Sequence, residues 1–266
     1  MEKRGSTKII VGQGRASGPR NALIALGLLA LVWEVLSRGA ARPPLLFPPP
    51  TAILASLYHS AVSGELLKCL CPTLFRLGLG FSAGAAVGVA AGFICGTWRL
   101  ADSVLDPLIN AAYPIPKVAL IPLLMFICGF GNVLIIVLAA FSAFFPMAVT
   151  VRAGVLRVDR TLVDAAVNLG AGRAQVAREV IFPSVVPYLL SGARLGLLGA
   201  IQAVVVAEML LSARGMGRML WLAGEWIKME IYYGYLAVMA LTGVVLVWGL
   251  GKLTRRLVPW AKNDAG

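Results

Sequence analysis

Long apolar runs with few charges alternate with short polar segments along most of this chain. An α-helix needs about 20 consecutive apolar residues to cross a bilayer. The pattern therefore predicts an all-α membrane protein with about six spanning helices. Their expected ranges are 21–37, 77–98, 106–131, 132–151, 188–211 and 231–251.

The segments between these runs complete the predicted organisation. Residues 1–20 hold five basic residues and several glycines, which favours a flexible basic tail. Residues 38–72 are expected on the external side, and their proline cluster prevents a helix before about residue 50. A short helix on the membrane surface is predicted for 51–59. The remaining ranges are a membrane core at 73–258, which includes a polar insert at about 153–186, and a second tail at 259–266.

The run 106–131 is interrupted by Pro114, Pro116, Lys117 and Pro122. Proline removes a backbone donor and kinks or breaks a helix. Irregular backbone at membrane depth is tolerated where it is buried in protein or lines a water-filled cavity. A lysine there is costly unless it reaches such a cavity, a partner or the headgroups. Lys117 is therefore predicted either to extend to the cytoplasmic interface or to line a solute pathway.

Two polar residues in the run 188–211 are also costly at membrane depth unless they are paired or reach water. Gln202 lies near the middle of the run, and Glu208 lies near its outer end. Both are candidates for a solute pathway. Glu208 has two further alternatives, which are a pair with a basic residue on another helix and a place in the outer headgroup layer.

Five glycines mark one face of the run 77–98. A step of four residues keeps them on one face of a helix. Glycine lets a second backbone approach closely, so that van der Waals contact holds helices together within the membrane. The spacing predicts a packing face, either within the chain or against a second copy. Its residues are Gly80, Gly84, Gly88, Gly92 and Gly96.

Composition agrees with a membrane protein and indicates its orientation. Charged residues make up 14% of the chain, whereas soluble domains contain about 25%. Lys and Arg collect in cytoplasmic segments of membrane proteins. Placing both termini in the cytoplasm puts 15 of the 24 basic residues there, in the first tail, around the insert, at the C-terminal end and at Arg99. This placement accounts for most of the net charge of +12, and nucleic-acid binding is not expected because aromatic and basic residues are not interleaved.

No arrangement of catalytic or metal-binding side chains is apparent. His59 is the only histidine, and the cysteines lack the C-x2-C spacing of a zinc or redox site. The stretch GLGKLT at 249–254 lacks the G-x4-G-K-[ST] spacing of a phosphate-binding loop. The sequence therefore predicts neither a metal site nor a means of hydrolysing a nucleotide. Energy for uphill transport would have to come from another chain.

The polar insert begins with signals for a helix start. Asp159 or Thr161 is positioned to cap the helix, because either side chain can accept a hydrogen bond from a free backbone N–H. Asp164 is expected in the first turn, where a carboxylate suits the positive end of the helix dipole. Small and medium apolar residues follow at helical spacing, so a short amphipathic helix is predicted.

The insert then turns at a glycine corner. Gly170-Ala171-Gly172 would end the first helix and permit a sharp change of direction. A second short helix is predicted for 174–181, and Pro183 and Pro187 are expected to mark its exit. Two short helices around such a corner form a compact knob whose small side chains suit insertion into a groove of a partner. A linker resting on lipid headgroups is the alternative.

The insert resembles the EAA loop in the membrane subunits of ATP-binding-cassette (ABC) importers. That motif consists of EAA, three residues, Gly, nine residues, a branched apolar residue, any residue and Leu-Pro. In this chain Asp replaces Glu and Phe replaces Leu, and the spacing is intact. The residues at the motif positions are Asp164, Ala165, Ala166, Gly170, Val180, Phe182 and Pro183.

Three further stretches extend the resemblance to one branch of this family. They are PIPKVALIPLLMFICGFG, FFPMAVTVRAGVLRVDRTLVDAAVNLGA and VVVAEMLLSARGMGRML. The branch includes permeases for nitrate, sulfonates, taurine and the pyrimidine precursor of thiamine. The resemblance implies a type I importer permease fold in the bacterial inner membrane and transport of a small solute, expected to be an anion such as a sulfonate, taurine or nitrate.

The resemblance also implies partners. A second permease copy would complete a homodimer, cytoplasmic ATPases would bind ATP and Mg, and an extracytoplasmic binding protein would deliver the solute. This chain would then hold no cofactor and would not be an enzyme. The residues implied in ATPase coupling are Asp164, Ala165, Ala166, Gly170, Gly172, Arg173, Val180, Phe182 and Pro183.

Two other classes of protein compete with this interpretation. A self-sufficient secondary transporter would be expected to show inverted repeats and ionisable residues at the membrane midplane, and the central runs are nearly free of charge. A membrane-embedded enzyme would need a nucleophile or metal cluster, which the sequence does not suggest.

Overall fold

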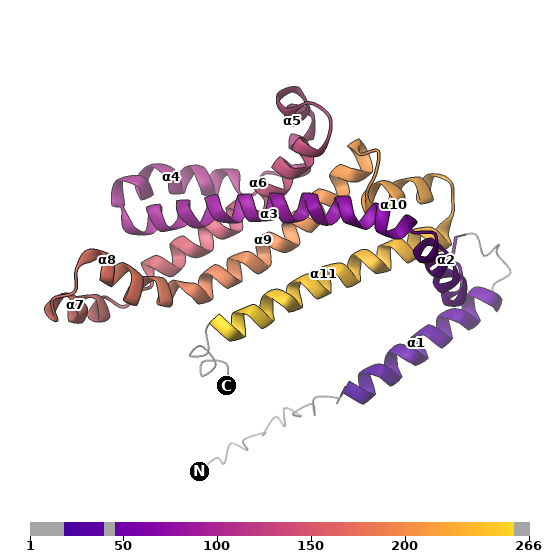
Figure 1. Cartoon of the computed structure of the whole chain (residues 1–266), viewed down its shortest axis with the longest axis horizontal. Helices are drawn as coiled ribbons and strands as arrows, with labels where there is room; N and C mark the ends of the chain where they lie inside the picture. The colour runs from indigo at the N-terminus through magenta and orange to yellow at the C-terminus, as the bar shows by residue number, and fades with distance from the viewer. Residues whose placement is uncertain (1–18, 40–45, 258–266) are drawn as a thin grey trace, which may run out of the picture.

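The computed structural model describes residues 19–39 and 46–257. These residues are almost entirely helical and form no strand, which confirms the prediction of an all-α protein. Four long helices run along the length of the molecule (Figure 1). They are α3 (Glu65–Thr97), α6 (Asn132–Leu156), α9 (Phe182–Leu211) and α11 (Met229–Leu257).

Four of the described helical runs are long and apolar enough to cross a membrane. A fifth span is counted if α4 (Arg99–Ala112) and the run 117–128 form one broken span, bent by 94°. The predicted first span lies on α1 (Pro19–Gly39), which is not among these runs, so that sixth span stays a prediction. The four continuous runs are Glu65–Thr97, Asn132–Leu156, Arg173–Leu211 and Met229–Leu253.

The break in the fifth span lies at the prolines of the sequence. The chain leaves the α-helix after Ala112 and resumes with a 3₁₀ turn, η1 (Lys117–Leu120), and the short helix α5 (Ile121–Cys128). Pro122 lies in the first turn of α5, where a missing N–H leaves no helical hydrogen bond unmade. In Figure 1, α5 consequently points away from the other helices, at the top of the view.

The glycines of α3 face α6 of the same chain. A Cβ on Gly80 would lie 2.5 Å from the Cβ of Ala139. At the other end of the contact, a Cβ on Gly96 would lie 2.5 Å from the Cβ of Val155. The contact advances along both helices together, so α3 and α6 run parallel and their backbones touch wherever a side chain is missing. The glycines between these two meet α6 in the same way and are Gly84, Gly88 and Gly92.

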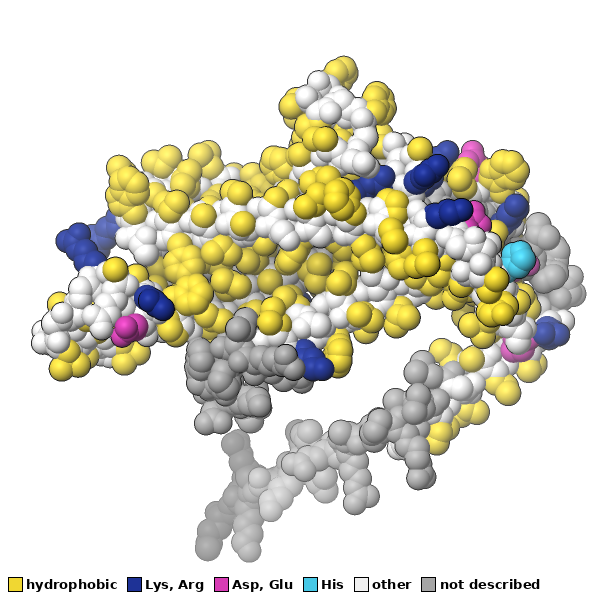
Figure 2. Space-filling view, viewed as in Figure 1, with side chains coloured by type: hydrophobic (Ala, Val, Ile, Leu, Met, Phe, Trp, Pro, Cys, Tyr) yellow, Lys and Arg dark blue, Asp and Glu magenta, His cyan; other side chains and the backbone are white. Residues whose placement is uncertain are grey.

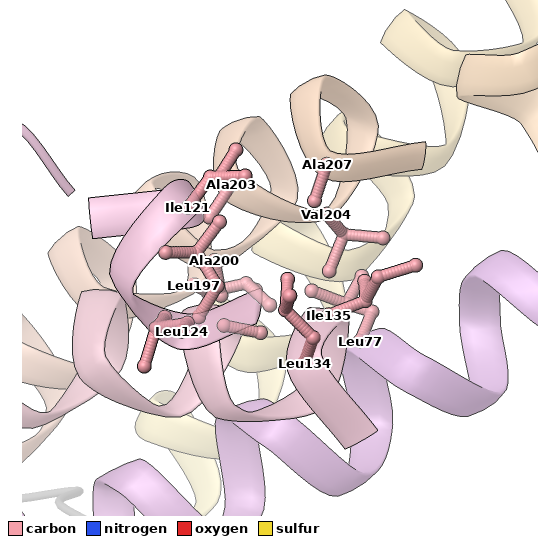
Figure 3. Packing of buried hydrophobic residues seen from close by; sticks show 12 residues of the cluster. Leu77, Ile121, Leu124, Leu134, Ile135, Leu197, Ala200, Ala203, Val204 and Ala207 are labelled. Carbon is pink, nitrogen blue, oxygen red and sulfur yellow. The ribbon is translucent and has the colours of Figure 1, made fainter. Parts of the chain in front are cut away.

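The main buried cluster joins α3, α5, α6 and α9 (Figure 3). On α6, Leu134 and Ile135 are fully buried within it. On α9, alanines face the cluster and let this helix approach α6 closely. The labelled residues in Figure 3 are Leu77, Ile121, Leu124, Leu134, Ile135, Leu197, Ala200, Ala203, Val204 and Ala207.

Short helices lie at both ends of this bundle. The end on the left of Figure 1 holds α7 (Arg160–Asn168) and α8 (Arg173–Val176), and it is called the α7 end below. The opposite end holds α2 (Pro50–Val62) and α10 (Met216–Glu225), and it is called the α10 end. The helix α2 includes the predicted surface helix at 51–59, whereas α10 was not predicted.

Two boundaries differ from the sequence prediction. Helix α3 begins at Glu65 instead of near residue 77, because charged residues interrupt the apolar run there without interrupting the helix. The predicted second helix of the insert does not exit at Pro183 and Pro187. Instead α8 continues through a π-helical turn (Ala177–Ile181) into α9.

Pro183 and Pro187 do not break the helical run 173–211. Pro183 lies in the first turn of α9, and the π turn directly before it already departs from the i→i+4 bonding that a proline disrupts. Pro187 follows one turn later, inside α9. Residues 173–211 therefore form one helical run from the insert into the bundle.

Candidate functional site

Charged side chains gather toward the two ends of the molecule. In Figure 2, hydrophobic side chains cover the middle of the visible face, and most of the Lys, Arg, Asp and Glu side chains lie near the α7 end or the α10 end. This distribution is expected when the middle lies in hydrocarbon and the ends lie in water or headgroups. Polar groups that could bind a partner or a solute therefore lie at both ends and along the helices that connect them.

At the α7 end, the first helix of the insert begins at a side-chain cap. The Asp159 carboxylate accepts a hydrogen bond from the Thr161 N–H at 2.9 Å. Hydrogen bonds from the side chain and backbone of Thr161 lower the pKa of Asp159 below its usual range. With the cap at Asp159, the prediction that Asp164 lies in the first turn is wrong, because α7 has no acidic residue there. Asp164 lies one turn further on, exposed on the surface.

The corner after α7 depends on a glycine in the left-handed region. Gly170 has a φ of +86°, with no atom near enough to restrict a side chain. The Gly170 N–H donates to the Val167 carbonyl at 2.9 Å, and the Ala171 N–H donates to the Ala166 carbonyl at 3.0 Å. This pair of bonds is the Schellman arrangement that ends a helix at a residue with positive φ. The glycine is therefore required by backbone conformation and not by space.

The knob formed by α7, this corner and α8 exposes apolar side chains. Leu169 is 89% exposed, and Leu162 and Val167 are each more than half exposed. Large apolar side chains exposed at a polar end of a membrane protein are typical of an interaction site. Leu169 was not among the predicted coupling residues, although it belongs to the apolar positions of α7.

The structure divides the predicted coupling residues into two groups. Those from α7 to the start of α8 lie together on the projecting knob. The others lie at its base, where the Phe182 ring stacks on Phe93 of α3 with centroids 6.4 Å apart. The knob group is Asp164, Ala165, Ala166, Gly170, Gly172 and Arg173, and the base group is Val180, Phe182 and Pro183.

At the α10 end, Glu208 is buried in an ion pair. Its side chain is fully buried, and Arg76 Nη1 of α3 lies 2.5 Å from its Oε1. The Thr73 hydroxyl lies 2.8 Å from Oε2, and the Gly217 N–H donates to the same oxygen at 3.0 Å. Of the three alternatives for Glu208, the structure shows the pair with a basic residue on another helix. A pathway role for Glu208 stays a prediction.

The same ion pair holds α10 in place. Arg76 also donates to the Arg214 carbonyl at 2.8 Å and to Asn132 Oδ1, at the start of α6, at 2.9 Å. The N-terminus of α10 points at the Glu208 carboxylate, which suits the positive end of the helix dipole. The cluster of Thr73, Arg76 and Glu208, called the buried clamp below, thus ties α10 to α3, α6 and α9.

Arg76 was not predicted as the partner of Glu208. Arg76 lies directly before the apolar run of α3, and Glu208 lies near the far end of α9. A charged residue within a span is costly unless it is paired. Two opposite charges near the same predicted side of the membrane were therefore the available signal, although it does not distinguish among several basic residues there.

A second ion-pair cluster lies nearer the α7 end. Arg152 of α6 makes a two-point contact with Asp102 of α4, with Nε–Oδ1 at 2.5 Å and Nη2–Oδ2 at 3.0 Å. Its Nη1 also lies 3.1 Å from Asp106. Each of these side chains is about one-quarter exposed. The cluster fastens α4 against α6, and it was not predicted.

The two remaining pathway candidates lie in different surroundings. Lys117 is half-buried, and its Nζ donates to the Tyr113 carbonyl at 2.5 Å, a carbonyl that the broken helix leaves free. Its ammonium also lies 4.9 Å from the Tyr113 ring centroid. Gln202 is exposed and lines a groove of about 1220 Å³ between α9 and α11. The structure does not bring Lys117, Gln202 and Glu208 together.

Comparisons with known proteins agree with this architecture. Residues 88–262 match the family model described as binding-protein-dependent transport system inner membrane component. The chain is 33% identical to the taurine transport system permease protein of Escherichia coli (strain K12), over 91% of this chain and 90% of that protein. It is 28% identical to a putative aliphatic sulfonates transport permease protein of Bacillus subtilis (strain 168), over 94% and 90%.

A solved structure shares the fold. An inward-facing structure of the MetNI methionine ABC transporter contains a chain that aligns with a TM-score of 0.62 at 20% identity, over 72% of this chain and 95% of that chain. At this identity the likeness concerns the arrangement of helices alone.

Proposed function

Because the chain belongs to the family of binding-protein-dependent transport system inner membrane components, we propose that it conducts a small organic anion across the membrane. Taurine and aliphatic sulfonates are the favoured solute class, since relatives that share about a third of their residues over nine-tenths of the chain are named for them. Nitrate and the pyrimidine precursor of thiamine are the alternative solutes.

The exposed knob at the α7 end is the observation that carries the proposed mechanism. Its apolar side chains Leu162, Val167 and Leu169 are more than half exposed, Leu169 most of all, and its corner is fixed by Gly170. A separate cytoplasmic ATPase receives this knob in a cleft and binds the ATP and Mg. The helical run 173–211 begins in the knob and continues through the bundle, so movement of the knob is passed directly to α9. This chain itself is not an enzyme.

The proposed orientation follows from the same contact. With the knob in the cytoplasm, α2 and α10 face the extracytoplasmic side, where a binding protein delivers the solute. Both termini then lie in the cytoplasm, if α1 is a span. A second copy of the chain completes the permease, as the resemblance of its sequence to this family implies.

The test replaces residues of the knob and measures docking separately from insertion. Gly170→Asp forces a side chain into a left-handed backbone position, and Ala166→Arg places a long cation on the half-buried face of α7. Both variants are expected to abolish uptake and to reduce co-purification of the ATPase in parallel, while the protein remains in the membrane. Ala61→Arg, which changes an exposed alanine of α2 at the other end, is the matched control.

Unchanged ATPase binding in both knob variants would exclude the docking role. The solute is identified separately, by ligand-dependent thermal shift of the binding protein that delivers to this permease. A shift with taurine or alkanesulfonates is expected. A shift with nitrate or a pyrimidine alone would replace the proposed solute class without affecting the coupling mechanism.

A further inference from the structure

An open groove follows the length of α9 and α11. It has a volume of about 1220 Å³ and is lined on α9 from Pro187 to Val206. Those residues span roughly 28 Å at the helical rise of about 1.5 Å per residue, which is close to the thickness of about 30 Å of a bilayer's hydrocarbon core. The groove therefore extends through most of the depth of the membrane and differs from a local pocket at one surface.

The polar side chains of this groove share one wall. Ser191, Arg194 and Gln202 are its hydroxyl, cationic and amide side chains, and all three belong to α9 and are exposed. Spacings of three and eight residues keep them on one face of a helix. The α11 wall opposite is apolar, apart from the indole of Trp248. The groove thus has a polar stripe along one side and a hydrocarbon surface along the other.

The charge in this groove is not neutralised by the described part of the protein. None of the described residues that line the groove carries a carboxylate. The ion pairs of the described residues leave Arg194 out, whereas Arg76 and Arg152 on other spanning helices are both paired. An arginine at membrane depth faces water, a charged partner or the headgroups. Its planar fork of N–H donors matches the oxygens of an anion such as a carboxylate or sulfonate.

We infer that this groove forms part of the solute pathway and that Arg194 binds the anionic group of the solute. Gln202, about two turns closer to the α10 end, offers amide N–H donors. The Ser191 hydroxyl, one turn closer to the α7 end, donates to the Pro187 carbonyl at 3.0 Å and must rotate away from it to donate to the solute. The apolar wall of α11 contacts the carbon portion of the solute. The inference rests on the proposed function and adds to it the residues that select for charge.

Two other occupants would fill the same groove. An acyl chain of a lipid fits the apolar wall, but it leaves the Gln202 amide in hydrocarbon without a hydrogen-bond partner, which is costly. A helix of a second copy would also cover the groove and exclude water from it. Water and anions therefore reach Ser191 and Gln202 only if the groove is a pathway, and this difference can be measured.

The experiment labels single cysteines with reagents of opposite charge. Ser191→Cys and Gln202→Cys are made in the assembled transporter after Cys69, Cys71, Cys95 and Cys128 are replaced by alanine. The probes are 2-sulfonatoethyl methanethiosulfonate, which carries the sulfonate group itself, and its 2-trimethylammonioethyl counterpart. Both attach by displacement of methanesulfinate by the thiolate. The anionic probe is expected to react about tenfold faster than the cationic one, relative to their rates with a free thiol, because a basic groove concentrates anions.

Controls separate the groove from the rest of the protein. Arg194→Gln should abolish the preference for the anionic probe, and it should reduce uptake of the anionic solute without reducing ATPase co-purification. Lys228→Gln removes one positive charge outside the groove and should leave the preference intact. Val87→Cys, which is exposed at mid-span on α3 and outside the groove lining, is expected to face lipid and to react with neither probe.

Two results would overturn the inference. Failure of both groove cysteines to react would show that lipid or another helix fills the groove. Reaction without a charge preference, or a preference that survives Arg194→Gln, would show a wet groove without an anion site. Neither result bears on ATPase docking, which is measured by co-purification, so failure of this inference and failure of the proposed function are distinguishable.

Discussion

The α10 end buries charged side chains, whereas the α7 end exposes apolar ones. At the α10 end, the buried clamp contains a fully buried carboxylate and a guanidinium side chain that is 8% exposed, and each has its hydrogen-bond partners within the chain. At the α7 end, the knob leaves large apolar side chains such as Leu169 in the open. Buried charges that are fully paired hold one arrangement of helices. Exposed apolar groups at a polar end are typical of a surface that a partner covers, as proposed for the knob.

Long helices connect the α7 end to the α10 end. Helix α9 carries Glu208 near its last turn and continues from the knob through the π turn. Helices α3 and α6 touch along the glycine face, so they act as one rigid unit beside α9. The buried clamp fixes the helices at the α10 end, and the knob at the α7 end is exposed. Such an arrangement is suited to convert docking at the knob into movement along α9.

The largest expected effect comes from breaking the buried clamp. Arg76→Ala or Glu208→Ala leaves one buried charge without its partner, and such a loss costs about 3–5 kcal/mol of unfolding free energy. Denaturation in detergent, followed by helical circular dichroism, measures this cost. The double variant Arg76→Leu/Glu208→Leu removes both charges and is expected to be more stable than either single variant. Single variants within about 1 kcal/mol of the natural protein would show that water reaches the clamp and screens it.

The second-largest effect is expected from disrupting the glycine face between α3 and α6, which run from one end of the molecule to the other. Gly88→Leu forces a side chain against the Phe144 carbonyl oxygen, where even a Cβ would lie only 2.6 Å away. Overpacking of this kind costs about 1–3 kcal/mol or more, and separation of α3 from α6 should lower both thermal stability and assembly. Gly78→Leu is the matched control, because nothing lies within 4 Å of a Cβ at Gly78. Equal stability of the two variants would mean that the glycine face does not hold the helices together.

The sequence predicted the features that depend on local patterns. Apolar runs located the spanning helices, and the four-residue glycine step located the face of α3 that meets α6. Proline located the break before α5. Each of these follows from a rule that acts over a few residues, such as helix length, backbone donors and the absence of a side chain.

Features that depend on distant residues were not predicted. The partner of Glu208 lies 132 positions earlier in the chain, and only the packing of α3 against α9 brings the two together. The contact of Arg152 with Asp102 likewise depends on the packing of α6 against α4. Helix α10 was missed because it is short and has glycine both at its N-cap, Gly215, and in its first turn, Gly217. Its start is stabilised by Glu208 and not by a capping side chain of its own. The continuity across Pro183 was missed because a π turn has no simple sequence signal.

An intermediate effect is expected at the corner of the knob. Gly170→Ala places a Cβ at a φ of +86°, which costs about 1–2 kcal/mol for a residue other than glycine. The cost should weaken ATPase co-purification about 5–30-fold if the knob docks only in its folded form, and it should leave the thermal stability of the bundle unchanged. Gly249→Ala, at a position with free space and an ordinary φ, is the control. A loss of bundle stability in Gly170→Ala would contradict the separation of the two ends.

The smallest effect concerns the cap of α7 and depends on pH. Hydrogen bonds from Thr161 lower the pKa of Asp159 in the folded knob, so its carboxylate stabilises α7 fully at pH values above its ordinary pKa of about 4. This stabilisation is lost as the pH falls through the lowered value, because the protonated acid accepts hydrogen bonds poorly. Amide hydrogen exchange of α7 at neutral pH should therefore become faster in Asp159→Ala, whereas the amides of α6 should not change. Asn168→Ala, at the other end of α7, removes a side chain without a capping bond and serves as the control. Acceleration of exchange in α6 and α9 as strong as in α7 would show that the knob does not unfold independently of the bundle. The α7 end and the α10 end would then form one cooperative unit.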